Sequence, residues 1–140
     1  MELSRPQNGW AVDASCVGNP GPMEYRCVDI ATGKLIFRSK LYPLGTNNLG
    51  EFLGIVHALA KLQQKNLSQI TLFTDSNTAL AWARKSDIRS KLPYSADTKN
   101  LLDDISRAVI WLKTHPNHNP IKKWNTQAWG EIPADFGRKS

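Results

Sequence analysis

The spacing of apolar residues changes once along the chain, near Thr46, from a strand pattern to a helix pattern, and this change most constrains the fold. Before it, residues 9–16, 24–30 and 34–41 are β-prone and predict three strands. Residues 18–22 (GNPGP) form a dense turn signal between the first two strands. We therefore expect the three strands to form an antiparallel meander.

Beyond Thr46, helical and strand-like segments alternate. Apolar residues recur at helical spacing from Leu49 to about residue 65. The later segments predict a strand at 69–74, helices at 76–84 and 97–114, a loop at 85–96, a strand at 121–124, and a last helix opened by Pro133. This order, β-β-β-α-β-α-α-β-α, predicts an α/β protein with a mixed sheet. Strands 9–16 and 69–74 are expected to be parallel neighbours, with the helix from Leu49 in the crossover.

Length, composition and charge limit the class of protein. The 140 residues are 41% apolar and 21% charged, and we expect residues 1–140 to form one domain. We expect no membrane partner, because the sequence shows neither a membrane-spanning apolar run nor a signal-peptide core. The formal charge of +6 favours a polyanionic partner such as nucleic acid. Cys16 and Cys27 are interpreted as reduced thiols of a cytoplasmic protein, although they could face each other across a hairpin.

Four carboxylates occupy positions that suit catalysis. Asp13 ends the first predicted strand and Asp75 ends the fourth, where an acid must be solvated or paired. Glu51 lies in the first turn of the helix after Thr46, and Asp135 lies near the C-terminus. Each also has a plain structural explanation, because acids cap helices or favour their first turns. If the four converge, their repulsion requires cations, and carboxylate oxygens suit Mg²⁺ or Mn²⁺.

Five short motifs together carry a family resemblance. They are Asp13-Ala14-Ser15, Gly18-Asn19-Pro20-Gly21, Thr46-Asn47-Asn48 with Glu51, Thr74-Asp75-Ser76, and Ala134-Asp135-Phe136-Gly137-Arg138. Each motif alone is weak, but all five occur in order at compatible spacing. From about residue 9 to residue 139 the chain resembles type 1 ribonuclease H, and residues 123–131 resemble its Bacillus-like bacterial branch.

The resemblance implies a ribonuclease H-like fold with a five-stranded mixed sheet and helices on both faces. It implies an endoribonuclease that cleaves the RNA strand of RNA–DNA hybrids with two Mg²⁺ ions, for which Mn²⁺ substitutes, and leaves 3′-hydroxyl and 5′-phosphate ends. Roles in removing R-loops and primer RNA are implied as well. The implied metal ligands are Asp13, Glu51, Asp75 and Asp135, with Asp13 bridging the ions. The resemblance also implies that Glu51 contacts a 2′-hydroxyl and that Glu131 assists metal movement and product release.

Contacts to the hybrid are implied by the same resemblance. Gly18 and Asn19 match a turn near the RNA strand, Asn47 and Asn48 match minor-groove readers, and Asn77 stands where the branch often has glutamine. Thr46, Asn48 and Ser90 match a pocket for a DNA phosphate, and Thr126 and Lys139 match further backbone contacts.

Some features depart from relatives within the family. Residues 85–96 are too few for the basic protrusion of the enteric-type enzymes, which predicts a weaker grip on the hybrid. Glu131 stands where those enzymes carry a catalytic-loop histidine, and His115 and His118 are interpreted as solvated loop residues. We recognise no N-terminal hybrid-binding domain and expect a monomer without an obligate protein partner.

Two other functions stay open at this point. A transposase or integrase core on the same fold also places acids at strand ends, but residues 46–48 and 135–138 argue against it. A catalytically silent nucleic-acid-binding module is the second alternative, and the complete set of acids argues against it.

Overall fold

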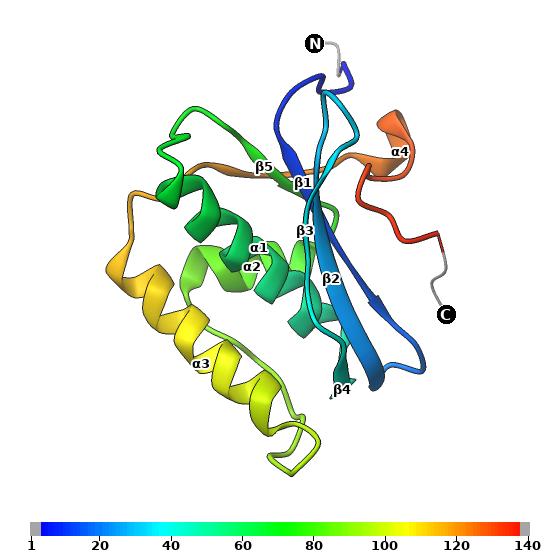
Figure 1. The fold of residues 1–140 in the computed structure, drawn as a ribbon, viewed down its shortest axis with the longest axis vertical. Coiled ribbons are helices and arrows are strands. Elements are labelled where there is room, and N and C mark those ends of the chain that lie inside the picture. The colour runs from blue at the N-terminus through cyan, green and yellow to red at the C-terminus, as the bar shows by residue number, and fades with distance from the viewer. Residues whose placement is uncertain (1–3, 138–140) are drawn as a thin grey trace.

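A mixed sheet forms the centre of the computed structural model, which describes residues 4–137 (Figure 1). Its strands are β1 (Trp10–Cys16), β2 (Gly21–Asp29), β3 (Leu35–Arg38), β4 (Tyr42–Gly45), β5 (Leu72–Thr74) and β6 (Ile121–Lys123). The helices are α1 (Asn47–Gln64), α2 (Asn77–Lys85), α3 (Lys99–Thr114) and α4 (Thr126–Trp129). Across residues 4–137, no helix combines the length and the apolar character that a membrane crossing requires.

The strand pairing confirms the predicted topology. The order across the sheet is β3-β2-β1-β5-β6, and β4 also pairs with β2. β2 runs antiparallel to β1, β3 and β4, whereas β5 is parallel to both β1 and β6. The antiparallel meander and the parallel half of the sheet therefore meet at β1, and α1 lies in the crossover that leads from one half to the other.

The single strand predicted at 34–41 is wrong in its extent, because the chain divides it into β3 and β4. At Ser39 the regular ladder is interrupted. The Tyr25 N–H donates to Ser39 Oγ (2.9 Å) rather than to a backbone carbonyl, while the Ser39 N–H donates to the Tyr25 carbonyl (2.8 Å). β4 then pairs near the start of β2, opposite Gly21 and Met23. The sheet consequently has six strands where five were expected.

The helix predicted to open at Pro133 is also wrong, because residues 133–134 form a turn and no helix follows within the described chain. A short helix, α4, forms earlier, where the Asn125 side chain accepts from the backbone N–H three residues later (3.0 Å). It ends at Gly130, whose φ of +82° suits a glycine. Two carbonyls beyond Pro133 accept hydrogen bonds from the side chain of Arg26 on β2, so they are not available to a helix.

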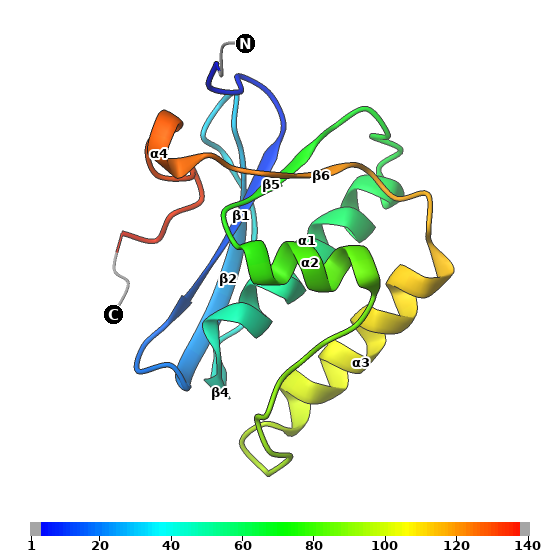
Figure 2. The ribbon, with the colours of Figure 1, turned by 180° about the vertical axis from the view of Figure 1, so that it is seen from behind.

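Helices cover the two faces of the sheet unequally. α1 packs along β1 and β2, with α2 and α3 beside it, and this side holds the larger hydrophobic core. The other face is covered by α4 and residues 130–137 (Figure 2). Trp124 is fully buried there with Ile132 and Ala134, and its Nε1 donates to the Gly130 carbonyl (2.9 Å). Trp124 therefore supports this second core and does not line a binding surface.

The two cysteines do not face each other across the hairpin. In the register of β1 and β2, Cys16 lies opposite Met23 and Cys27 lies opposite Val12. Both thiols are buried and neither forms a disulfide within residues 4–137, and burial raises the pKa of each. Both thiols pack in the larger core, and the Cys16 thiol also donates to the Gly45 carbonyl (3.4 Å).

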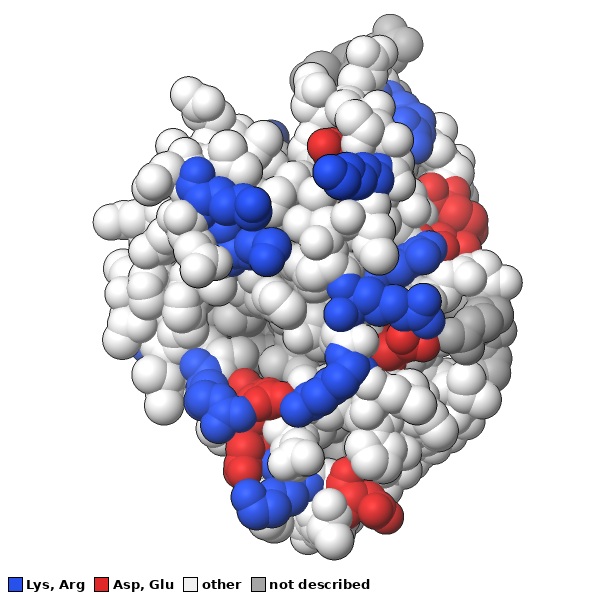
Figure 3. All heavy atoms as spheres, in the orientation of Figure 1, with Lys and Arg blue, Asp and Glu red and all other residues white. Residues whose placement is uncertain are grey.

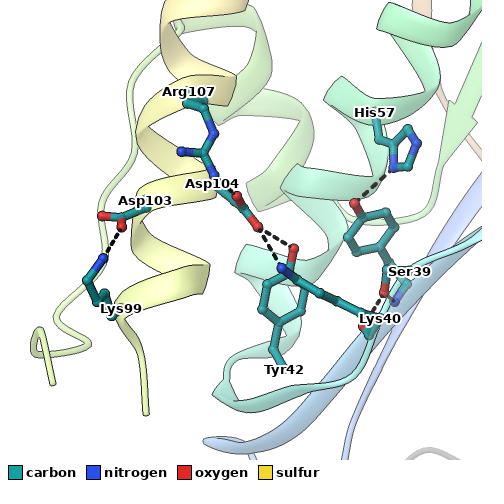
Figure 4. A network of polar contacts seen from close by, with 9 residues as sticks. Ser39, Lys40, Tyr42, His57, Lys99, Asp103, Asp104 and Arg107 are labelled. Atoms are coloured by element: carbon teal, nitrogen blue, oxygen red, sulfur yellow. Dashed lines mark hydrogen bonds and ion pairs between the residues drawn. The ribbon is translucent and has the colours of Figure 1, made fainter. Parts of the chain in front are cut away.

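A polar network around Asp104 ties α3 to the sheet (Figure 4). The Tyr42 hydroxyl donates to Asp104 Oδ2 (2.7 Å), and Lys40 Nζ lies 3.8 Å from the same oxygen. Arg107, one turn further along α3, pairs with the other carboxylate oxygen. Burial, followed by the bond to Asp104, raises the pKa of the Tyr42 hydroxyl, which therefore stays protonated as a donor. Because β4 leads directly into α1, this network helps to fix where α1 begins.

The start of α1 approaches the sheet very closely at Gly50. A Cβ at this position would lie 2.5 Å from Met23 Sδ and 2.9 Å from Ala14 Cβ. One turn later, a Cβ at Gly54 would have no heavy atom closer than 3.5 Å. Only the first of these two glycines is therefore required by packing.

We predict that Gly50→Ala lowers the free energy of unfolding by about 1–3 kcal/mol, the usual cost of overpacking a core. Gly54→Ala is the matched control in the same helix, and it should be neutral or stabilising because alanine favours helix formation. Chemical denaturation of both variants measures the difference. Equal stabilities would contradict the close approach at Gly50.

Candidate active site

The parallel register of β1 and β5 brings two of the predicted acids together. Ala11 lies opposite Phe73, so two residues further along Asp13 lies beside Asp75, just beyond the end of β5. Asp13 is fully buried and Asp75 is half-buried. Figure 2 shows β5 passing beside β1 and leading into α2. Asp75 follows the carboxyl end of β5, an edge at which open α/β sheets bind ligands. The prediction that Asp13 ends its strand is wrong, because β1 continues to Cys16 through its pairing with β2.

Glu51 reaches the same place from α1. The helix begins after Thr46, whose hydroxyl oxygen accepts from the Leu49 N–H (3.3 Å). The Glu51 side chain is 1% exposed, and its Oε2 accepts from the Ala14 N–H on β1 (3.1 Å). This bond holds the carboxylate beside Asp13.

Three carboxylates thus form one group, in which a ligand atom from each of Asp13, Glu51 and Asp75 lies within 4.8 Å of the others. Glu51 Oε1 is buried and has no hydrogen-bond partner among the described residues. A buried oxygen of this kind is costly unless something binds it. Oxygen-only donors are the ligands that Mg²⁺ and Mn²⁺ prefer, so the residues present fit a divalent metal ion.

The electrostatics of the group agree with that fit. Burial raises the pKa of Glu51 well above its usual value of 4.5, and the hydrogen bond to Asp13 and the charges of Asp13 and Asp75 raise it further. The Ala14 N–H acts in the opposite direction. Ionised Glu51 is therefore disfavoured in the protein alone, and a bound cation would favour it.

The fourth predicted acid, Asp135, is not part of this group of three. It lies half-buried in the segment that crosses the outer face of the sheet, and its Oδ2 accepts from the Gly137 N–H (3.1 Å). Its backbone carbonyl accepts from Arg26, which lies opposite Asp13 in the pairing of β1 and β2. Glu131 is exposed in the turn after α4 and is also outside the group.

Several predicted substrate contacts gather at the start of α1. The Asn19 Oδ1 accepts from the Asn47 N–H (2.9 Å) and so joins the turn after β1 to the first residue of the helix. Gly18, with φ of +85°, forms that turn, and Asn48 is exposed on the first turn of α1. The structure therefore places Gly18, Asn19, Thr46, Asn47 and Asn48 on one continuous surface.

The other predicted substrate contacts come from later segments of the chain. Asn77 is exposed as the first residue of α2, and Ser90 is exposed in the loop beyond it, where its Oγ accepts from the Leu92 N–H (3.2 Å). Thr126 is the first residue of α4. Lys139 lies outside the described residues.

The two loop histidines belong to the opposite end of the sheet. His115 and His118 lie in the connection that enters β6, whereas the acids lie where β5 ends, and β5 and β6 are parallel. The His115 ring stacks on Trp111 at 4.2 Å between centroids, and its Nδ1 is hydrogen-bonded to the Trp111 carbonyl (2.7 Å). His115 and His118 are half-buried loop residues, so they are less solvated than expected, and they lie away from the acids.

Arg26 and one surface pocket were missed in the sequence. Arg26 was not identified as a site residue from the sequence. Pairing the predicted strands 9–16 and 24–30 as a hairpin would have placed this cation opposite Asp13. A pocket of about 380 Å³ is lined by residues including Asn77, Trp82, Lys85 and Arg89. Its lining residues come from α2 and from the loop after it, and only folding brings them around one hollow.

Comparison with known proteins gives the family. Residues 6–128 match the RNase H family model, described as "RNase H". The chain is 30% identical over 119 residues to ribonuclease HI of Synechocystis sp., covering 74% of this chain and 73% of that protein. It is 39% identical over 64 residues to ribonuclease H of Nitratidesulfovibrio vulgaris, covering 46% of this chain and 40% of that protein.

Solved structures share the fold. RNase H1 from the halophilic archaeon Halobacterium salinarum aligns with a TM-score of 0.58 at 17% identity, covering 86% of this chain and 87% of that one. LC11-RNase H1, solved in complex with an RNA/DNA hybrid, aligns with a TM-score of 0.54 at 17% identity, covering 85% of this chain and 86% of that one.

A mixed sheet of this order, with three carboxylates gathered from β1, α1 and the residue after β5, fits an α/β nuclease of the metal-dependent class. The chain belongs to the RNase H family. The resemblance to type 1 ribonuclease H is confirmed, and with it the hydrolase class, while membership of the Bacillus-like branch stays a prediction.

We predict that Glu51→Gln raises the free energy of unfolding of the metal-free protein at neutral pH by about 1–3 kcal/mol, the scale of a buried polar group without a partner. Because folding raises the Glu51 pKa, its contribution to stability is present below the usual value of 4.5 and is lost as the pH rises through the raised pKa.

Thermal unfolding in chelator, across a pH series, compares this variant with the wild type and with Asp97→Asn, which removes an exposed carboxylate. The wild type and Asp97→Asn should lose stability relative to Glu51→Gln as the pH rises. Added Mn²⁺ should stabilise the wild type more than Glu51→Gln. Parallel pH profiles for all three proteins would contradict the electrostatic account.

Proposed function

We propose that this protein is an endonuclease that cleaves the RNA strand of RNA–DNA hybrids and leaves 3′-hydroxyl and 5′-phosphate ends. The observation that supports this most directly is the convergence of Asp13, Glu51 and Asp75 in a chain that belongs to the RNase H family. LC11-RNase H1, which shares the fold, was solved with an RNA/DNA hybrid bound. The family is metal dependent, and the acids of this chain suit that dependence.

In this proposal Asp13, Glu51, Asp75 and Asp135 would hold two Mg²⁺ ions, for which Mn²⁺ could substitute, and Asp13 would be a ligand of both. Such ions lower the pKa of a bound water and stabilise the leaving oxygen of a phosphodiester. The chain orients the ligands for this chemistry, since the Ala14 N–H fixes Glu51 Oε2 and leaves Oε1 for the ion. In this proposal Glu51 also contacts a 2′-hydroxyl, and exposed Glu131 assists metal movement and product release.

The surface at the start of α1 is the proposed place of contact with the RNA strand. A 2′-hydroxyl both donates and accepts, so carboxamides can distinguish RNA from DNA. Asn19 uses its oxygen on Asn47, which leaves its NH₂ group as a donor toward the substrate. Asn47 and Asn48 complete this surface, which adjoins Glu51 in the same helix.

The DNA strand is proposed to bind through phosphates. Thr46, Asn48 and Ser90 are the proposed phosphate pocket, with Thr126 and Lys139 as further backbone contacts, Lys139 lying outside the described residues. Asn77 is proposed as a substrate contact at the position where the branch often has glutamine. Figure 3 shows that, on the face seen there, lysines and arginines lie in separate groups, some of them beside acids. A formal charge of +6, without the basic protrusion for which residues 85–96 are too few, favours a modest grip on the hybrid that weakens with salt.

The cellular setting is part of the same proposal. We expect residues 1–140 to act as one catalytic domain, as a monomer in the cytoplasm, where R-loops and primer RNA provide the hybrid. The buried thiols of Cys16 and Cys27, which form no disulfide within the described residues, are compatible with a reducing compartment.

We predict that Asp13→Asn or Asp75→Asn reduces cleavage of a labelled RNA–DNA hybrid to the level seen in chelator, because each removes a charge from the metal ligands. Binding of the hybrid in chelator should survive in both variants. Asp97→Asn is the matched control, with an exposed carboxylate far along the chain from the group, and should cleave like the wild type.

The same assay includes duplex DNA, duplex RNA and single-stranded RNA. Loss of the hybrid's RNA strand alone, with Mg²⁺ or Mn²⁺, is the expected result. Cleavage of duplex DNA would favour the transposase or integrase alternative. Hybrid binding without turnover under either metal would identify a silent binding module and overturn the proposed activity.

We predict that Asn48→Ala lowers kcat/KM for the hybrid by about two- to tenfold, the value of one hydrogen bond of roughly 0.5–1.5 kcal/mol. Asn48 is exposed and makes no cap of its own, so the change leaves α1 intact. Steady-state kinetics beside Asn117→Ala, an exposed loop asparagine, provide the comparison. Unchanged kinetics for Asn48→Ala would remove it from the proposed contact surface.

A further inference from the structure

Arg26 makes an unusual set of contacts for a strand residue. Its Nε donates to the Ala134 carbonyl (2.8 Å) and its Nη2 donates to the Asp135 carbonyl (2.5 Å). These residues are more than a hundred positions away in the chain. The guanidinium also lies over the Phe136 ring, 4.7 Å from its centroid. One side chain therefore grips three consecutive residues of the C-terminal segment.

The position of Arg26 connects this segment to the acids. Arg26 is the antiparallel partner of Asp13, so the two side chains leave the sheet next to each other on the same face. The Asp135 carbonyl is consequently held at the end of the Arg26 side chain, and Arg26 occupies the strand position that pairs with Asp13. No regular secondary structure holds residues 130–137 there, since they form neither a helix nor a strand.

A second arginine reinforces the grip. Arg38 lies opposite Arg26 in the pairing of β2 and β3, and its guanidinium lies 5.6 Å from the centroid of the Phe136 ring. Arg38 is itself held by Glu24, whose Oε1 accepts from Arg38 Nε (2.7 Å). The Phe136 ring is thus in contact with cations from two neighbouring strands.

We propose that Arg26 is a positioning residue of the active site, which holds residues 134–136 on the sheet so that the Asp135 carboxylate joins Asp13, Glu51 and Asp75 in binding metal. This inference rests on the proposed function, since it assigns Asp135 to the metal site. It adds that the site depends on a cation two strands away from β5, acting through backbone carbonyls. A planar guanidinium suits this role because it presents two donors at fixed geometry.

The test compares Arg26→Met, which keeps a long apolar side chain without donors, with Arg26→Lys, which keeps one charged donor. Arg84→Met is the matched control, because Arg84 Nη2 also donates to a distant backbone carbonyl, that of Ile121 at the start of β6 (3.1 Å). Three measurements are made on each protein: hydrogen exchange of residues 132–137, Mn²⁺ binding by calorimetry without nucleic acid, and kcat and KM on the hybrid.

Arg26→Met should speed exchange of residues 132–137, weaken Mn²⁺ binding by about tenfold or more, and lower kcat with little change in KM. Arg26→Lys should recover part of each loss, and Arg84→Met should change none of them. If Arg26→Met does not fold, the Mn²⁺ affinity of Arg26→Lys decides the matter. Mn²⁺ affinity and kcat within about twofold of the wild type in the Arg26 variants would overturn the inference.

Failure of the proposed function gives a different pattern. A wild type that binds Mn²⁺ but never cleaves the hybrid would refute the activity, while a weaker Mn²⁺ affinity in Arg26→Met would still support the role of Arg26. A wild type that cleaves, with Arg26 variants indistinguishable from it, would refute only the positioning role.

Discussion

The close approach of α1 to β1 is the constraint on which the site depends. Gly50 carries no side chain, so the helix backbone comes near Ala14 and Met23, and the next residue, Glu51, can then accept from the Ala14 N–H. A larger residue at position 50 would move the helix outward and separate Glu51 from Asp13. Packing and chemistry are thus joined in two consecutive residues, because one permits the contact that the other uses.

The cluster of three carboxylates is energetically unfavourable in a protein interior. Asp13 and Glu51 are almost completely buried, and burial raises the pKa of Glu51. A domain of this size has only a small net free energy of unfolding. The free-energy cost of burying such a cluster is therefore a substantial fraction of that stability. A divalent ion bound there would relieve both the desolvation and the repulsion, and its binding would then be linked to folding. The burial and mutual repulsion that destabilise the metal-free carboxylates would also favour the binding of a cation.

Predictions from the sequence succeeded where local pattern decides structure. The periodicity from Leu49 located α1, and the apolar runs before Asp13 and Asp75 located two parallel strands whose register brings those acids together. The predictions failed where a contact distant in the chain decides. Ser39 takes a hydrogen bond from Tyr25 and divides one predicted strand into two, and Arg26 takes the carbonyls that a helix after Pro133 would have used. Neither contact is predicted by a residue periodicity or by a short motif in the sequence.

The sequence by itself determined the class of fold, the family and the acids, because strand and helix periods and short ordered motifs are local properties of the chain. Only the tertiary structure decided which acids meet. It brings one carboxylate oxygen from each of Asp13, Glu51 and Asp75 within 4.8 Å of the others. It places Asp135 on a separate segment that is held by Arg26. The physical reason is that β1 and β5 are paired as parallel strands, and α1 packs closely against β1. Residues 130–137 have no such ladder, and side-chain contacts with the outer face of the sheet set their position.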